Sequence, residues 1–441
     1  MKVKYLVFEI GSTTTLASAF DYKEGILKLI SQGRAYTTVL EGDVTLGLKN
    51  AIKNMEEKLK EKVEGEKIFA TSSAAGGLKI SVHGLMYDMT VKAGREAALG
   101  AGGIIKFITS GKLRKSDIKK IKEKDINLIL ISGGVDYGER DTTIYNSELI
   151  AREIKDIPIL YCGNIENHED VKEIFKNNIL YISENVYPTI DELNVESARS
   201  VIQKAFEENI TKAKGMEKIK QVVQNIMTTP GAIMESAKIL YKEIGDLVIF
   251  DVGGATTDIH SITEGSKEIL DILISPEPIA KRTVEGDLGV FINRENLIGL
   301  LEEHEILDFD SEDFINEVKA IPITEKEKKL SRILTKKAVK IAIKRHVGKV
   351  KRVFGENRYS ASGKDLSLVK YIIGTGGALT HLGKGEEILE KIKYKGKDLS
   401  MMPSIDSKVL IDKDYILAAA GIISKVSLED AMALIKESLG I

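Results

Sequence analysis

Two short segments of the chain combine a carboxylate, glycine and hydroxyl residues directly after an apolar run. The first extends from Glu9 to Thr15 (Glu-Ile-Gly-Ser-Thr-Thr-Thr) and the second from Asp251 to Asp258 (Asp-Val-Gly-Gly-Ala-Thr-Thr-Asp). Glycine lets backbone N–H groups approach phosphate oxygens, hydroxyls add donors, and a carboxylate holds Mg²⁺ through its water shell. One such segment is a common turn, whereas two predict a pair of loops that clamp one nucleotide.

In each segment the pattern predicts a β-hairpin with glycine and threonine in its turn. Asp251 is the predicted carboxylate on the Mg²⁺ side, and Asp258, across the hairpin, is predicted to orient water or the metal. Glu9 corresponds to Asp251 but is one methylene longer, so we expect a different metal geometry and slow hydrolysis. The residues predicted to contact phosphate are Gly11, Ser12, Thr13, Thr14, Gly253, Gly254, Thr256 and Thr257.

A third glycine cluster, Gly374, Gly376 and Gly377, follows another apolar run. Glycines there would let a flat ligand such as adenosine approach the backbone. The cluster is not a dinucleotide fingerprint, because Leu379 stands where a third glycine is required, and the chain has no Walker A sequence. Glu285 is predicted to begin a helix and to approach the base or ribose, with a surface helix start as the alternative.

Composition and charge exclude several classes of protein. The 441 residues include 64 Lys and Arg and 66 Asp and Glu, so the net charge of −2 favours neither nucleic acid nor an anionic membrane. The single cysteine, Cys162, excludes disulfides within the chain and a cysteine-ligated iron–sulfur cluster unless a second subunit contributes. No apolar run approaches the roughly 20 residues that span a bilayer, so we expect a cytoplasmic protein. The six histidines lack metal-ligand spacing.

The order of predicted elements divides the chain into three parts. Residues 1–115 form one lobe, residues 116–229 alternate strands with helices as in a parallel α/β subdomain, and residues 230–441 form a linking helix and a second lobe. Glycine turns at Gly133-Gly134 and Gly163-Asn164 follow predicted strands, where open α/β sheets place a ligand crevice. The acidic loop that contains Asp136 suits a partner or a second ligand, with a solvated loop as the alternative.

The three glycine motifs resemble the two-hairpin clamp of the actin, sugar kinase and heat-shock ATPase superfamily. The full set resembles one branch, the glutamate mutase-associated MutL (GlmL) family, which is unrelated to the mismatch-repair protein of similar name. The matching segments are Glu9 to Thr15, Thr71 to Leu78, Ala97 to Gly102, Leu130 to Asp136, Cys162 to Asn164, Thr229 to Pro230, Asp251 to Asp258, Arg282 to Gly289 and Gly374 to Gly377.

This resemblance implies an α/β fold with two actin-like (ribonuclease H-like) lobes and an inserted parallel subdomain. It also implies an ATP-dependent accessory or reactivating factor that acts on an adenosylcobalamin-dependent mutase or aminomutase of glutamate or ornithine fermentation. Glu9 replaces the aspartate usual in the superfamily, which puts the rate of hydrolysis in doubt and not nucleotide binding. A small-molecule kinase and a non-hydrolysing ATP-binding scaffold remain as alternatives, and the oligomeric state is open.

Overall fold

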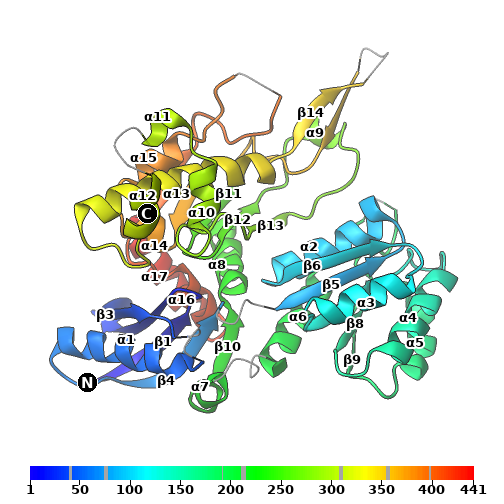
Figure 1. Cartoon of the computed structure of the whole chain (residues 1–441), viewed down its shortest axis with the longest axis horizontal. Helices are drawn as coiled ribbons and strands as arrows, with labels where there is room; N and C mark the ends of the chain where they lie inside the picture. The colour runs from blue at the N-terminus through cyan, green and yellow to red at the C-terminus, as the bar shows by residue number, and fades with distance from the viewer. Residues whose placement is uncertain are drawn as a thin grey trace. The chain divides into compact units, whose positions relative to one another are not determined.

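A computed structural model describes residues 1–38, 42–73, 78–190, 192–209, 215–306, 311–353, 358–396 and 399–441 (Figure 1). The chain divides into two compact units. Unit 1 comprises Met1–Ala75, Thr211–Leu273 and Arg282–Ile441, and unit 2 comprises Gly76–Ile210 and Ile274–Lys281. Each unit has its own mixed α/β architecture and is described by itself.

Unit 1 contains a five-stranded sheet in the order β10-β4-β1-β2-β3. Strands β1, β2 and β3 are antiparallel neighbours, whereas β4 and β10 run parallel to β1 and to β4 respectively. Residues Tyr5 to Ile10 of β1 are all buried, as expected for a central strand covered on both faces, and helix α1 packs against β2 and β3. The bounds are β1 (Lys2–Ile10), β2 (Thr14–Lys23), β3 (Ile26–Tyr36), α1 (Val44–Leu59), β4 (Glu64–Ser72) and β10 (Asn225–Thr228).

A second sheet in unit 1 repeats this topology, in the order β13-β12-β11-β16-β17. Strands β11 and β12 form an antiparallel hairpin, and β16 and β17 run parallel to β11. Numbered within each sheet, both orders are 3-2-1-4-5, so the similarity of the two hairpin segments extends to whole sheets. The bounds are β11 (Leu247–Val252), β12 (Thr257–Ile262), β13 (Ala280–Glu285), β16 (Tyr371–Thr375) and β17 (Lys408–Ile411).

Helices complete unit 1. Helix α8 (Thr229–Ile244) starts at a threonine cap followed by proline, and it packs closely on α16 (Leu417–Ile423), where Gly421 lies against the Ala232 backbone. The buried face of α13 (Glu325–His346) lies in the core of the second sheet. The other elements are α7 (Met216–Val222), α9 (Lys267–Leu270), α10 (Arg294–Gly299), α11 (Glu303–Ile306), α12 (Ser311–Glu317), β14 (Lys349–Arg352), β15 (Tyr359–Ser362), α14 (Gly377–Thr380), α15 (Gly385–Glu390) and α17 (Leu428–Leu439).

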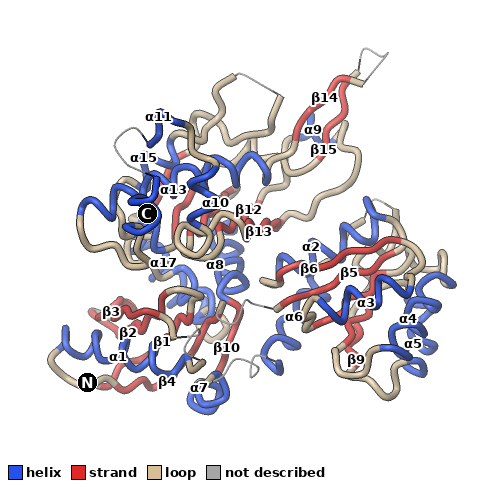
Figure 2. The backbone as a smooth tube through the Cα atoms, in the orientation of Figure 1, coloured by secondary structure: helices blue, strands red, loops and turns tan. Residues whose placement is uncertain are grey.

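Unit 2 is built on a parallel sheet in the order β6-β5-β7-β8-β9. In chain order this is 2-1-3-4-5, a doubly wound sheet with helices between its strands (Figure 2). One face of the sheet packs on an aliphatic core from α3, α4 and α5. The bounds are β5 (Lys79–Gly84), η2 (Tyr87–Val91), α2 (Lys92–Gly100), β6 (Ile104–Ser110), α3 (Lys115–Glu123), β7 (Leu128–Ser132), α4 (Asp141–Glu153), β8 (Ile159–Tyr161), η3 (Ile165–Asn167), α5 (His168–Ile174), β9 (Leu180–Ile182) and α6 (Glu196–Asn209).

The structure places several boundaries differently from the sequence analysis. The inserted unit starts at Gly76 and not at residue 116, because β5 and β6 pair in the sheet of β7, and β10 joins the first sheet of unit 1. The prediction that Glu285 begins a helix is wrong, because Ala280–Glu285 form strand β13, which pairs with β12 at the edge of the second sheet. Residues 74–77 of the segment Thr71 to Leu78 lie outside the described residues.

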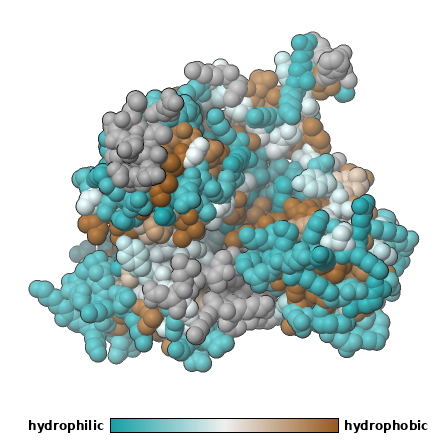
Figure 3. Space-filling model, viewed as in Figure 1, coloured by the Kyte–Doolittle hydropathy of each residue, from teal (hydrophilic) through white to brown (hydrophobic). Residues whose placement is uncertain are grey.

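The drawn surface is largely polar, and the single cysteine lies in the interior. Hydrophilic residues cover most of the face drawn in Figure 3. No helix in the described ranges is long and apolar enough to cross a membrane. Cys162 is fully buried after β8, where its Sγ lies 3.5 Å from the Ile131 carbonyl oxygen, and burial raises the pKa of its thiol.

Candidate functional site

The loop after β1, which we call loop I (Gly11 to Thr13), is a tight hairpin turn. The Gly11 N–H donates to the Thr14 carbonyl oxygen at 3.0 Å. The Ser12 hydroxyl donates to the Ser73 carbonyl at 3.1 Å, so this side chain fastens loop I to the end of β4. The Ser12 hydroxyl is therefore engaged in a hydrogen bond within the protein. Its backbone N–H is the group left to contact a ligand.

The loop after β11, loop II (Gly253 to Ala255), is closed in the same way. The Gly253 N–H donates to the Thr256 carbonyl oxygen at 3.0 Å, the equivalent of the bond in loop I. Loop II is also supported from behind, because the Gly254 carbonyl accepts hydrogen bonds from Phe291 N and Ile292 N. The predicted hairpins are therefore present at both places and close with equivalent hydrogen bonds.

Loops I and II meet each other within unit 1. A Cβ atom added at Gly254 would lie 2.6 Å from Thr13 Oγ1, closer than a van der Waals contact allows. Within the described chain, the backbone N–H groups of Ser12, Thr13, Gly254 and Ala255 make no hydrogen bond. Two adjacent loops thus present unpaired amide donors, the arrangement that binds anionic oxygens.

The two carboxylates that precede these loops occupy equivalent strand positions. Glu9 stands two residues before Gly11, and Asp251 stands two residues before Gly253. Burial raises the pKa of Glu9 to about 7, and Asp412 adds to this rise, while Tyr415, whose hydroxyl donates to Glu9 Oε1 at 3.1 Å, opposes it. Burial, Asp258 and Glu9 together raise the pKa of Asp251. The site therefore brings together carboxyl groups whose ionised forms a bound cation would stabilise.

Asp258 has a different environment from the one expected. Its two carboxylate oxygens accept hydrogen bonds from Arg282 Nη2 at 2.8 Å and from the Thr256 hydroxyl at 2.9 Å. Asp258 and Arg282 are both buried, with the arginine only 1% exposed. Asp258 is thus held as half of a buried ion pair behind loop II, and this pair fixes Thr256 at the end of the turn.

The residues predicted for the base and ribose are not equivalent to one another. Gly374 is packed in the interior, where an added Cβ would lie within 3 Å of Ile411 and Leu389 side-chain atoms. Gly376 has φ +84°, and a Cβ atom added there would lie 2.5 Å from Asp251 Oδ1, so the position requires glycine. At Gly377 the nearest atom to an added Cβ is 3.9 Å away, so only this position of the cluster offers open space for a ligand.

Glu285 is part of an ion-pair network and not the start of a helix. Arg345, on α13, donates to Glu285 Oε2 at 2.6 Å and to both Asp287 oxygens at 2.8 and 3.0 Å. Burial raises the pKa of Glu285, and Arg345 opposes the rise. Thr257 is likewise structural, since its hydroxyl donates to the Leu288 carbonyl oxygen.

Three residues of the site were missed by the sequence analysis. Tyr415 has φ +52° and reaches Glu9 from the segment that follows β17. Asp412 is fully buried and accepts hydrogen bonds from Thr375, Ser438 and the backbone of the Ile416 turn. Arg282 was quoted only as part of a motif. Asp412 follows an apolar run as Asp251 does, which is the one signal that pointed to it.

A hydrated Mg²⁺ fits these residues better than a directly ligated metal. No group of three or more His, Cys, Asp and Glu side chains in the described ranges is arranged to hold a metal ion. Glu9 and Asp251 stand at the ends of equivalent strands beside the unpaired amides of loops I and II, and Glu9 helps to raise the pKa of Asp251. Mg²⁺ usually keeps several waters and takes one or two protein carboxylates together with phosphate oxygens, which suits this pair.

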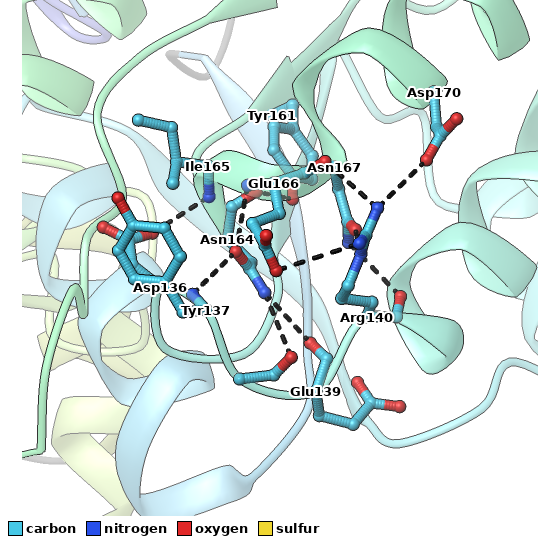
Figure 4. A network of polar contacts seen from close by, with 11 residues as sticks. Asp136, Tyr137, Glu139, Arg140, Tyr161, Asn164, Ile165, Glu166, Asn167 and Asp170 are labelled. Carbon is cyan, nitrogen blue, oxygen red and sulfur yellow. Dashed lines mark hydrogen bonds and ion pairs between the residues drawn. The ribbon is translucent and has the colours of Figure 1, made fainter.

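Unit 2 carries a separate polar network at the ends of β7 and β8 (Figure 4). Asp136 accepts hydrogen bonds from Ile165 N and Asn185 Nδ2, both at 2.9 Å. The buried Asn164 joins the two loops, because its Oδ1 accepts from Tyr137 N and its Nδ2 donates to the Gly138 carbonyl oxygen. The acidic loop is therefore a braced structure and not a freely solvated one.

The duplicated 3-2-1-4-5 sheets with a carboxylate and a glycine turn at each first hairpin define an actin-like ATPase fold with an inserted parallel subdomain. Residues 5–439 match the family described as MutL protein. A curated relative, "Protein MutL" of Clostridium tetanomorphum, is 35% identical over 464 residues, which cover 99% of each chain. The chain belongs to the MutL family, as the motifs indicated.

Solved structures of distant proteins also align with most of the chain. Component A of (R)-2-hydroxyglutaryl-CoA dehydratase from Acidaminococcus fermentans is 8% identical with a TM-score of 0.33, and 99% of each chain is covered. A glycerol dehydratase reactivase is 10% identical with a TM-score of 0.34, over 95% of this chain and 99% of that one. Because these scores are low, the fold assignment rests on the sheet order and not on them.

Proposed function

We propose that this protein binds ATP between loops I and II and uses it as an accessory, reactivating factor for an adenosylcobalamin-dependent amino-acid mutase or aminomutase. The observation that supports the ATP site is the meeting of two equivalent turns at Thr13 and Gly254, with unpaired N–H groups on both. A triphosphate placed there would receive donors from two sheets at once. Its binding would couple the positions of the two lobes.

Different groups of the site would hold Mg²⁺ and phosphate. Asp251 and Glu9 would hold the hydrated Mg²⁺, which supplies charge compensation for the phosphates. Ser12, Thr13, Gly254 and Ala255 would bind phosphate oxygens through their backbone N–H groups. Tyr415 orients the Glu9 carboxylate by its hydrogen bond, and Gly377 leaves space beside the nucleotide. We infer slow hydrolysis, because the Glu9 side chain is one methylene longer than the corresponding Asp251 and changes the metal geometry.

Membership of the MutL family supports the choice of partner, because the resemblance implies a cobalamin-dependent mutase of glutamate or ornithine fermentation. Nucleotide binding that closes the lobes would change the contact energy with the partner, and hydrolysis would reset that equilibrium. Unit 2 is the proposed partner-facing module, since loops I and II and the Gly377 cluster lie in unit 1. We do not propose a kinase, since Asp258 is held by Arg282 and is not available to take a proton from an acceptor hydroxyl.

Asp251→Asn tests the nucleotide site directly. The amide removes the charge that holds hydrated Mg²⁺ and keeps the shape of the side chain, so hydrolysis should fall by about 100-fold. Isothermal titration with ATP and Mg²⁺ should show binding by the wild type, and steady-state phosphate release should show the loss in the variant. Absence of any heat for the wild type at about millimolar ATP, or undiminished hydrolysis by Asp251→Asn, would contradict the proposal.

A further inference from the structure

The carboxyl edge of the unit 2 sheet exposes three large apolar side chains, one after each of three neighbouring strands. Tyr137 follows β7 and is 78% exposed, Ile165 follows β8 and is 49% exposed, and Ile190 follows β9 and is 70% exposed. Figure 4 shows Tyr137 and Ile165 turned to the same side of the polar network. In open α/β sheets this edge is where ligands bind. We call these three residues the apolar edge.

Hydrogen bonds between the loops hold the apolar edge in place. Ile165 N donates to Asp136, and Asp136 N donates to the Pro188 carbonyl oxygen at 2.9 Å, two residues before Ile190. Asn185 Nδ2 also donates to the Gly134 carbonyl oxygen at 3.0 Å. The three loops therefore form one braced platform, so little conformational entropy would be lost when a partner covers it.

Tyr137 is the most exposed of the three and has an unusual backbone. Its φ is +61°, a left-handed conformation that residues other than glycine, asparagine and aspartate rarely adopt. Nevertheless a tyrosine occupies this position and projects into solvent. Tyrosine is enriched at the energetically dominant positions of protein interfaces, because its ring buries a large area with few rotatable bonds.

The charge around the apolar edge identifies the kind of partner. Residues 132–141, 162–170 and 183–192, the three strand-end segments, contain nine Asp and Glu residues and a single basic residue, Arg140. Arg140 is itself bonded to Asn167 and lies near Glu166 and Asp170. The whole chain has a net charge of only −2, so this edge is a local concentration of negative charge. A complementary surface is apolar at its centre and basic at its rim.

We propose that the apolar edge of unit 2 is the docking surface for the partner enzyme, and that it takes a folded protein surface with an apolar centre and a lysine- or arginine-rich rim. This inference rests on the proposed function and adds to it where on unit 2 the mutase binds. The three apolar side chains insert between the loops of the partner, and the acidic segments steer the encounter and fix its orientation.

The test compares Tyr137→Asn/Ile190→Ser with a matched control, Ile179→Ser. Asparagine accepts the left-handed backbone at position 137, so the platform should keep its structure. Ile179 is 56% exposed but precedes β9, at the opposite edge of the same sheet. Melting temperature and basal ATP hydrolysis should be equal in all three proteins, because none of these residues lies in the nucleotide site.

The assay begins with the wild type and a cobalamin-inactivated mutase, with ATP and Mg²⁺. If the wild type neither binds nor reactivates the mutase, the proposed function itself fails. If it does, the double variant should bind the mutase about tenfold or more weakly and Ile179→Ser should bind normally. Raising salt from about 50 to about 300 mM should weaken the wild-type complex.

Three results would overturn the docking surface while leaving the proposed function intact. They are unchanged mutase binding by Tyr137→Asn/Ile190→Ser, an equal loss with Ile179→Ser, and a wild-type affinity insensitive to salt. Sedimentation of each protein alone provides a further check. A change of oligomeric mass in the double variant would show that a second copy of this chain covers the apolar edge instead.

Discussion

Loops I and II of unit 1 have the same turn but different surroundings. Each turn closes with a glycine N–H to threonine carbonyl bond of 3.0 Å. Loop II has a cation of its own, Arg282, which balances Asp258 across the hairpin from Asp251. Among the described residues, Glu9, which precedes loop I in β1, accepts a side-chain hydrogen bond only from the neutral Tyr415 hydroxyl. Local sequence therefore determines the turn, whereas distant residues determine how its charge is compensated.

Removing the cation of loop II should have the largest effect. Arg282→Met leaves Asp258 as a buried, uncompensated carboxylate, so the free energy of unfolding should fall by about 3–5 kcal/mol. Urea denaturation measures the loss. Arg345→Met is the matched control, because it breaks a partly exposed network with Glu285 and Asp287 and should cost about 1 kcal/mol or less. Equal losses in the two variants would mean that burial does not distinguish the pairs.

Glu9→Gln should remove a pH dependence specific to loop I. The folded pKa of Glu9 is about 7, above the ordinary 4.5, so the neutral form is favoured by folding. The resulting stability is fully present below about pH 4.5 and is lost as pH rises through 7. Relative to Glu9→Gln, the nucleotide-free wild type should lose up to about 3 kcal/mol between about pH 4.5 and 8.5. Melts across this range test it, and a constant difference between the proteins would contradict the assignment.

The contact between the loops should have the smallest effect of the three. Gly254→Ala places a methyl group against Thr13, so nucleotide affinity should fall about tenfold, or about 1.4 kcal/mol. Adding Thr13→Ala should restore part of the loss, because it provides space for the methyl group. Gly286→Ala is the control, since nothing lies within 4 Å of the added Cβ. Additive losses in the Thr13/Gly254 double mutant would show that the loops act independently.

The sequence predicted the structural elements that depend on residues close together in the chain. Both hairpins and the parallel strands of the insert follow from local patterns, and the structure contains them. The sheet partners of β5 and β6 could not be predicted, because pairing depends on residues far along the chain. For that reason the insert begins near Gly76 and not at residue 116.

The residues of the candidate site that lie beside the two hairpins were predictable from the sequence, and those brought there by tertiary packing were not. Glu9, Asp251 and the turn glycines were found because they stand beside their strands in sequence. Tyr415 was not, because it reaches Glu9 from 406 residues away. The buried pairing of Asp258 with Arg282 and the interior position of Gly374 also depend on tertiary packing, which no local spacing encodes.

The burial of Cys162 makes the chain suited to site-specific labelling. Its thiol is fully enclosed and its pKa is raised, so little thiolate forms and maleimides should leave it unmodified in the folded protein. A cysteine introduced at an exposed position, such as Ile179→Cys, would then be the only reactive thiol. A fluorophore attached there, away from the proposed docking surface, would report partner binding through fluorescence anisotropy without any need to remove a native cysteine.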